Sequence, residues 1–137
     1  MSKRLSPRQK AAIEESERVR LYRRMALRAQ GFMCFYCWEP LSHIAATADH
    51  LIARARRGKT TYDNIRAACA RCNNLKGTLH WREFMRLIER ADMWDAPEFW
   101  LIKAERRLWG ATWESCGRIA AYAGVSAPAA VLGVHQI

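Results

Sequence analysis

The chain has 137 residues and a formal net charge of +10 at pH 7, and its length fits one domain with a terminal extension. A hydrophobic content of 50% and six Trp exclude a disordered chain, and no apolar run reaches the roughly 18 residues of a membrane span. No apolar run follows the basic first four residues, so we expect no secretory signal and an intracellular protein that is cytoplasmic, nucleoid-associated or phage-encoded.

Two segments hold the basic charge. Residues 1–31 carry nine Lys or Arg against three Glu, and residues 50–76 carry seven against Asp63 alone. Residues 77–137 are balanced, with seven of each sign. An excess gathered in this way is typical of a protein that binds a polyanion such as double-stranded DNA. A solvated basic surface that aids solubility is the alternative.

A long helix is expected at the N-terminus. Ser6 suits an N-cap, Pro7 suits the first helical position, and Gly31 follows Gln30 as a C-terminal stop. Residues 1–31 are therefore interpreted as a basic N-terminal helix. Its arginines fit two roles equally well: a charged solvent face on a docking helix, or an arm that follows the DNA backbone.

Residues 32–77 contain the most informative pattern. Two C-x2-C pairs, separated by 31 residues, place four thiols at the spacing of one tetrahedral zinc site. In an intracellular chain this pattern favours zinc over disulfides. The predicted ligands of this structural Zn²⁺ are Cys34, Cys37, Cys69 and Cys72. Because the core is small, loss of the zinc should unfold the module.

Short extended segments and helices are expected around and after these cysteines. Residues 46–52 and 64–69 suggest two short strands, and a helix should begin near Cys72 and be interrupted around Gly77. We expect residues 78–125 to form a helical C-terminal extension packed on the core, with helices at 78–91, from Pro97 to Gly110, and at 112–123. Residues 126–137 are expected to form a tail. The predicted fold class is α+β and mostly helical.

The order of the polar residues among the cysteines resembles the HNH endonuclease family, in its zinc-stapled branch. The resemblance covers about residues 32–77 and rests on Cys34-x2-Cys37, Asp49-His50, Asn64 and Cys69-x2-Cys72-Asn73-x2-Lys76-Gly77. It implies a ββα-metal core, in which two short antiparallel strands and a helix surround one divalent cation. It also implies metal-dependent hydrolysis of a DNA phosphodiester.

The resemblance further implies a role for each motif residue. His50 matches the general base, and Asn64 matches the residue that holds the loop and the histidine in place. Asp49 and Asn73 match the ligands of the catalytic ion. Because Asn73 stands where the family has His or Asn, the choice between Mg²⁺ and Mn²⁺ stays open. Lys76 supports either the helix or a phosphate.

The chemistry of phosphodiester hydrolysis suits these residues. An imidazole with an unperturbed pKa of about 6.5 is a suitable base near neutral pH, and carboxylate and amide oxygens suit Mg²⁺ or Mn²⁺. Neighbours on a regular strand point to opposite faces, so Asp49 and His50 meet only through a bulge or twist, or at a strand edge. Flanking phosphates would be bound by Arg54, Arg56, Arg57 and Lys59, with Lys76 as a further candidate.

Other functions explain part of the pattern. A non-catalytic zinc-dependent DNA-binding module accounts for the cysteines and the charge, but it needs no base beside oxygen ligands. A protein-interaction zinc knuckle leaves the charge unexplained. Turn or capping roles are the structural alternatives for Asp49, Asn64 and Asn73. The sequence leaves open whether the enzyme is a nickase, whether it cuts both strands as a homodimer, and whether a partner protein supplies specificity.

Overall fold

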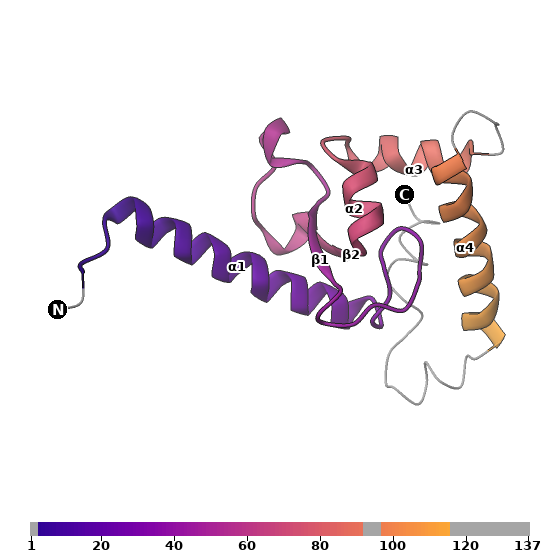
Figure 1. Cartoon of the computed structure of the whole chain (residues 1–137), viewed down its shortest axis with the longest axis horizontal. Coiled ribbons are helices and arrows are strands. Elements are labelled where there is room, and N and C mark those ends of the chain that lie inside the picture. The colour runs from indigo at the N-terminus through magenta and orange to yellow at the C-terminus, as the bar shows by residue number, and fades with distance from the viewer. Residues whose placement is uncertain (1–2, 92–96, 116–137) are drawn as a thin grey trace.

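The computed structural model describes residues 3–91 and 97–115 (Figure 1). These residues form four α-helices, a two-stranded antiparallel sheet and two short 3-10 helices. The fold class is α+β and mostly helical, which confirms the prediction. Within the described ranges, none of the helices has the length and apolar character needed to cross a membrane. The predicted tail, residues 126–137, lies outside these ranges.

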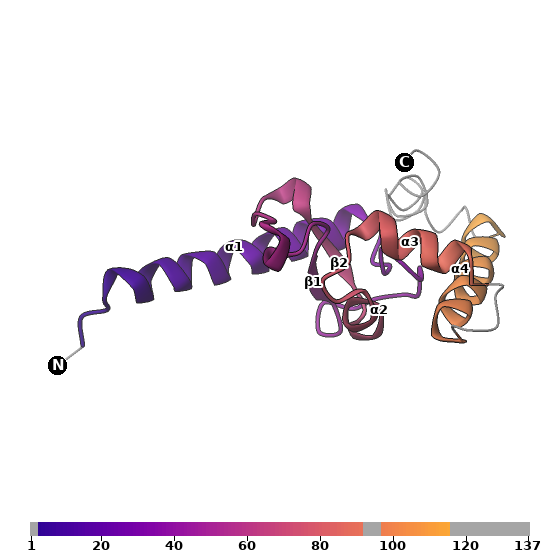
Figure 2. The same ribbon diagram turned by 90° about the horizontal axis from the view of Figure 1, so that it is seen from above.

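The N-terminal helix α1 (Pro7–Ala29) has the predicted start and end. The Ser6 hydroxyl accepts a hydrogen bond from the Gln9 backbone N–H, and the Gln9 side chain accepts one from the Ser6 N–H, so a capping box fixes the start. Gly31 follows the helix with a φ of 66°. The first turns of α1 extend away from the other elements, whereas the helix from Glu15 onward contacts the loop after β1 and then the sheet (Figures 1 and 2).

A buried glutamine joins α1 to the sheet. The Gln30 amide donates to the carbonyls of Met33 and Ala67, each at 2.8 Å, and accepts from the Ala67 N–H at 2.9 Å. A buried polar group without partners costs about 1–3 kcal/mol, so these bonds hold Gln30 in one arrangement. The C-terminal end of α1 is therefore fixed against the second strand.

The sheet and the next helix form the ββα arrangement that the family resemblance implies. β1 (Thr47–His50) pairs antiparallel with β2 (Ile65–Ala68), with Asp49 opposite Arg66 and His50 opposite Ile65. α2 (Ala70–Lys76) follows β2 and starts earlier than the sequence suggested, because Cys69 is its N-cap and accepts from the Cys72 N–H. Gly77 ends α2 with a φ of 53°. Two 3-10 turns, η1 (Arg54–Arg56) and η2 (Tyr62–Asn64), lie in the loop between the strands.

Two further helices close the core. α3 (Trp81–Glu89) buries Phe84, Met85 and Ile88, and the Phe84 ring packs edge-on against Tyr36 with centroids 4.9 Å apart. α4 (Pro97–Ser115) packs against α3 and buries Ile102. The core thus gathers around the segment between the first two cysteines.

The predicted end of α4 at Gly110 is wrong. The helix continues through Gly110 to Ser115, which also removes a separate helix start at residue 112; the rest of the predicted 112–123 helix lies outside the described residues. Gly110 faces the Trp38 ring, and an added Cβ would lie 3.0 Å from it. This glycine permits close packing and does not act as a C-terminal stop.

Candidate functional site

The four cysteines predicted to bind zinc come together in the interior. All four are buried, and their Sγ atoms lie within 4.8 Å of one another. The Sγ atoms of Cys37 and Cys69 are 3.9 Å apart. Tetrahedral zinc with Zn–S bonds of about 2.3 Å separates its sulfurs by about 3.8 Å, so the cluster fits one structural ion. Such an ion would join the Cys34–Cys37 segment to the N-terminus of α2.

Backbone donors surround the same cluster. The Cys69 N–H donates to the Cys34 Sγ at 3.3 Å, and the Cys72 N–H donates to the Cys69 Sγ at 3.4 Å. Hydrogen bonds to an ionised acceptor are stronger than those between neutral groups, so these donors favour the thiolate forms that bind zinc. Both the distances and the donors therefore fit a zinc centre.

A surface hollow of about 270 Å³ lies beside β1. Four of the predicted site residues line it: Asp49 and His50 from β1, Arg54 from the following turn, and Asn73 from α2. The two strands pair residue for residue from Thr47 to His50, so no bulge brings Asp49 and His50 together. Both residues nevertheless line the hollow beside this strand.

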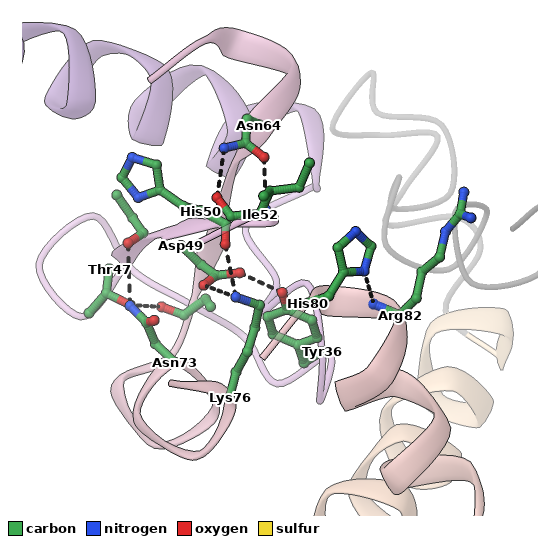
Figure 3. Close-up of polar contacts among 12 residues, drawn as sticks. Tyr36, Thr47, Asp49, His50, Ile52, Asn64, Asn73, Lys76, His80 and Arg82 are labelled. Carbon is green, nitrogen blue, oxygen red and sulfur yellow. Dashed lines mark hydrogen bonds and ion pairs between the residues drawn. The ribbon is translucent and has the colours of Figure 1, made fainter. Parts of the chain in front are cut away.

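Asp49 is buried and has two partners within the protein. Its Oδ2 accepts a hydrogen bond from the Tyr36 hydroxyl, and its Oδ1 lies 3.2 Å from the Lys76 Nζ (Figure 3). Burial raises the pKa of Asp49, while the Tyr36 hydroxyl and the Lys76 ammonium oppose that rise. A carboxylate has about four lone-pair positions, so these contacts leave it able to bind a cation as well.

Lys76 belongs to the interior of the site. Its side chain is 0% exposed, and its Nζ donates to the His50 carbonyl at 2.8 Å in addition to pairing with Asp49 (Figure 3). A buried ammonium held by two oxygens cannot reach a DNA phosphate. The sequence-based assignment of Lys76 to phosphate binding is therefore corrected, and its other predicted role, support of the helix, fits the contacts.

Asn73 is half-buried and is held by its amide nitrogen. The Nδ2 donates to the Thr47 hydroxyl at 2.9 Å and to the Ala48 carbonyl at 3.3 Å. Both bonds use the nitrogen, so the amide oxygen is the atom that could bind an ion. Asn73 lies inside α2, and Cys69 is the N-cap, which excludes the capping alternative. Together, the oxygens of Asp49 and Asn73 suit a hard divalent cation.

His50 is half-buried at the end of β1. Its Nε2 lies 3.1 Å from the Thr60 hydroxyl. Burial, assisted by the positive charges of Arg54 and Lys76, lowers the pKa of His50 below 6.5, although the Glu15 carboxylate opposes this. The imidazole is therefore mostly neutral near pH 7, which is the form that a general base requires.

Asn64 lies apart from the hollow and closes the loop that follows His50. Its Oδ1 accepts from the Ile52 N–H at 2.9 Å, and its Nδ2 donates to the carbonyls of Ile52 and Lys59 at 3.1 and 2.8 Å. Gly58 lies in the same tight loop, where an added Cβ would fall 1.6 Å from the Ile52 oxygen. These contacts give Asn64 a loop-holding position and not a place beside the reacting atoms.

The basic residues of this loop that are predicted to bind phosphates are exposed, and the loop lies beside two hollows. Arg54 lines the hollow beside β1, while Arg57 and Lys59 line a second hollow of about 450 Å³ next to Asn64. Arg56 lies 3.5 Å from the Glu83 carboxylate, and Arg54 lies 3.5 Å from that of Glu15. The loop thus presents positive charge at the rim of the candidate site.

Sequence reasoning missed four residues that support these groups. Tyr36 contacts Asp49, Thr47 contacts Asn73, and Thr60 links His50 to Glu15. None of them belongs to a recognisable motif. Glu15 lies 45 positions before Thr60 and among basic residues, so no local signal connects the two.

Comparison with known proteins agrees with this geometry. Residues 34–79 match the family described as HNH endonuclease, and this segment is therefore an HNH endonuclease domain, as the motif order predicted. The chain is also similar to the CRISPR-associated endonuclease Cas9 of Corynebacterium diphtheriae, with 38% identity over 61 residues. The aligned segment covers 44% of this chain and 6% of that protein.

Proposed function

We propose that the chain is a metal-dependent endonuclease that hydrolyses phosphodiester bonds in double-stranded DNA. One observation carries the proposal: the hollow beside β1 gathers a buried carboxylate, an amide, a half-buried imidazole and a guanidinium, from Asp49, Asn73, His50 and Arg54. The HNH match over residues 34–79 and the net charge of +10 support the same chemistry and a polyanionic substrate.

The residues divide the work of hydrolysis. Asp49 and Asn73 would hold Mg²⁺ or Mn²⁺, which when bound supplies positive charge to the scissile phosphate and the departing oxygen. His50 accepts a proton from the attacking water as that water approaches phosphorus opposite the leaving oxygen. Arg54 neutralises phosphate charge at the rim, with Arg56, Arg57 and Lys59 binding flanking phosphates.

The zinc centre contributes through the fold. Tyr36 lies between Cys34 and Cys37, so the segment that binds zinc also delivers a hydroxyl to the Asp49 carboxylate. We assign residues 32–77 to the catalytic core, residues 1–31 to a DNA-binding helix and residues 78–125 to a supporting extension. A monomer would act as a nickase, and a homodimer or a partner protein would be needed for paired cuts or sequence preference.

A plasmid assay tests the activity. Supercoiled DNA is incubated with the zinc-loaded protein and Mg²⁺, Mn²⁺ or EDTA. Relaxed or linear product that EDTA prevents is expected. His50→Ala should lower the cleavage rate by on the order of 10²–10⁴, the usual contribution of a general base, and should leave DNA binding intact. His43→Ala is the matched control, because His43 is exposed and does not line the hollow.

The non-catalytic DNA-binding module predicts a different outcome of the same assay. A gel shift that weakens with salt, with the plasmid intact in every metal, would favour that module. Normal cleavage by the His50→Ala variant would remove the proposed base.

A further inference from the structure

A chain of polar contacts connects His50 to the N-terminal helix. The His50 Nε2 lies 3.1 Å from the Thr60 Oγ1, and that hydroxyl donates to the Glu15 Oε1. The Glu15 carboxylate also lies 3.5 Å from the Arg54 guanidinium and 3.0 Å from that of Arg18. β1, the loop after it and α1 are therefore joined by one chain of polar contacts, from His50 through Thr60 to Glu15, which we call the relay.

The proton count along this relay fixes the state of the imidazole. A hydroxyl has one proton, and an ionised carboxylate can only accept. Because Thr60 gives its proton to Glu15, its oxygen can only accept from His50, so the His50 Nε2 must carry the hydrogen. A neutral imidazole has a single N–H, and the Nδ1 then keeps a free lone pair.

The charge state of Glu15 supports this direction. The Thr60 hydroxyl, with Arg54 and Arg18, lowers the pKa of Glu15 against a partial opposing effect of burial. An ionised Glu15 has no proton to donate, so if the Thr60 hydroxyl turned toward His50, the Glu15 Oε1 would lose its hydroxyl donor and keep the Arg54 guanidinium at 3.5 Å. The same arrangement would serve a purely structural role, which is to attach α1 to the loop, but that role predicts nothing about the imidazole.

We propose that Glu15 and Thr60 are positioning residues that hold His50 as its Nε2–H tautomer, with the Nδ1 free to accept the proton from water. The inference rests on the proposed function for the meaning of that free nitrogen. Glu15 lies outside residues 34–79, the segment that matches the HNH endonuclease family. The N-terminal helix would therefore complete the catalytic apparatus and not serve as a DNA-binding arm alone.

The tautomer can be measured without any cleavage assay. Long-range ¹H–¹⁵N spectra of the full zinc-loaded chain, recorded well above the imidazole pKa, distinguish Nε2–H from Nδ1–H, and a His50→Gln sample assigns the signals. We expect a single Nε2–H form in the natural chain and in Thr60→Ser. Thr60→Val keeps the shape but loses the hydroxyl, so we expect a mixture of tautomers, and likewise in Glu15→Ala. An Nδ1–H form in the natural chain, or unchanged signals in Thr60→Val, would overturn the relay.

Kinetics supply the second readout. Thr60→Val and Glu15→Ala should lower kcat about tenfold with little change in KM for plasmid, a fraction of the full contribution of a base. Thr60→Ser should keep the activity. Glu17→Ala removes an exposed acid from the same helix and controls for the change in charge. If the natural chain does not cut DNA, the proposed function fails. The spectra test the tautomer of His50, and therefore the relay, in either case. Normal kcat in both variants with one unchanged tautomer would contradict the relay alone.

Discussion

The Asp49–Lys76 pair offers the sharpest test of the site's energetics. Both side chains are buried, with 3% and 0% exposure, and the two charges lie 3.2 Å apart. Lys76→Met keeps most of the stem's packing but removes the ammonium. Of the two partners of Asp49 described above, the Tyr36 hydroxyl then remains. The His50 carbonyl loses the hydrogen bond that it accepts from Lys76.

The size of the effect follows from these losses. Removing one partner of a buried ion pair usually destabilises a protein by about 3–5 kcal/mol, because the other charge stays buried without compensation. An unsatisfied buried carbonyl adds about 1–3 kcal/mol where it cannot find water. Protonation of Asp49 relieves part of the cost, so we expect a total of about 3–5 kcal/mol. That is a large share of the roughly 5–15 kcal/mol that stabilises a typical domain.

Urea unfolding of the zinc-loaded protein at neutral pH measures this difference. Lys59→Met, which removes an exposed ammonium from the nearby loop, should change the free energy of unfolding by less than about 0.5 kcal/mol. Asp49→Asn combined with Lys76→Met should recover part of the loss, since no unpaired charge is left. Burial already raises the pKa of Asp49, and loss of Lys76 removes one of the groups that oppose this rise, so the deficit should shrink as pH falls and Asp49 is protonated. A Lys76→Met variant as stable as the natural chain would refute the buried pair.

Three further predictions concern the zinc, the tyrosine and the pH dependence. Chelation of zinc should lower the melting temperature sharply and abolish binding and cleavage of DNA together; a chelated protein with unchanged circular dichroism would count against a structural ion. Tyr36→Phe keeps the ring but removes a hydrogen bond to a charged group, and should cost about 1.5–3 kcal/mol by urea unfolding; equal stability would argue against the Tyr36–Asp49 contact. Because burial lowers the pKa of His50 and the base must be neutral, cleavage should rise with pH through a midpoint below 6.5 and then level off; a midpoint above 6.5 would contradict the neutral base.

The sequence predicted the parts of this molecule that depend on local signals. The Ser6-Pro7 start of α1 and the cysteine spacing both depend on neighbours within one turn or one tight loop, and the structure has both. The prediction that Gly110 ends a helix is wrong because a glycine can either end a helix or allow a neighbouring ring to pack closely. Only the position of Trp38 in the fold decides between these roles. Of the two roles predicted for Lys76, phosphate binding does not fit for a similar reason: the ammonium is buried against Asp49 and the His50 carbonyl, which the fold brings from 26 positions or more before it.

The contacts of α1 also change how the chain is divided. Composition separates a basic helix, residues 1–31, from the cysteine-bearing core, and the projecting first turns of α1 agree with that division (Figure 1). The Gln30 amide, however, donates a hydrogen bond to β2, and the Glu15 carboxylate accepts one from the loop after His50. Removing this segment would take away the amide that hydrogen-bonds to the sheet and the carboxylate that hydrogen-bonds to the loop. The polar groups that they contact in the sheet and the loop would then lose these partners. The part of α1 from Glu15 onward would therefore belong to the proposed catalytic unit, so that its boundary falls inside the helix and not at residue 31.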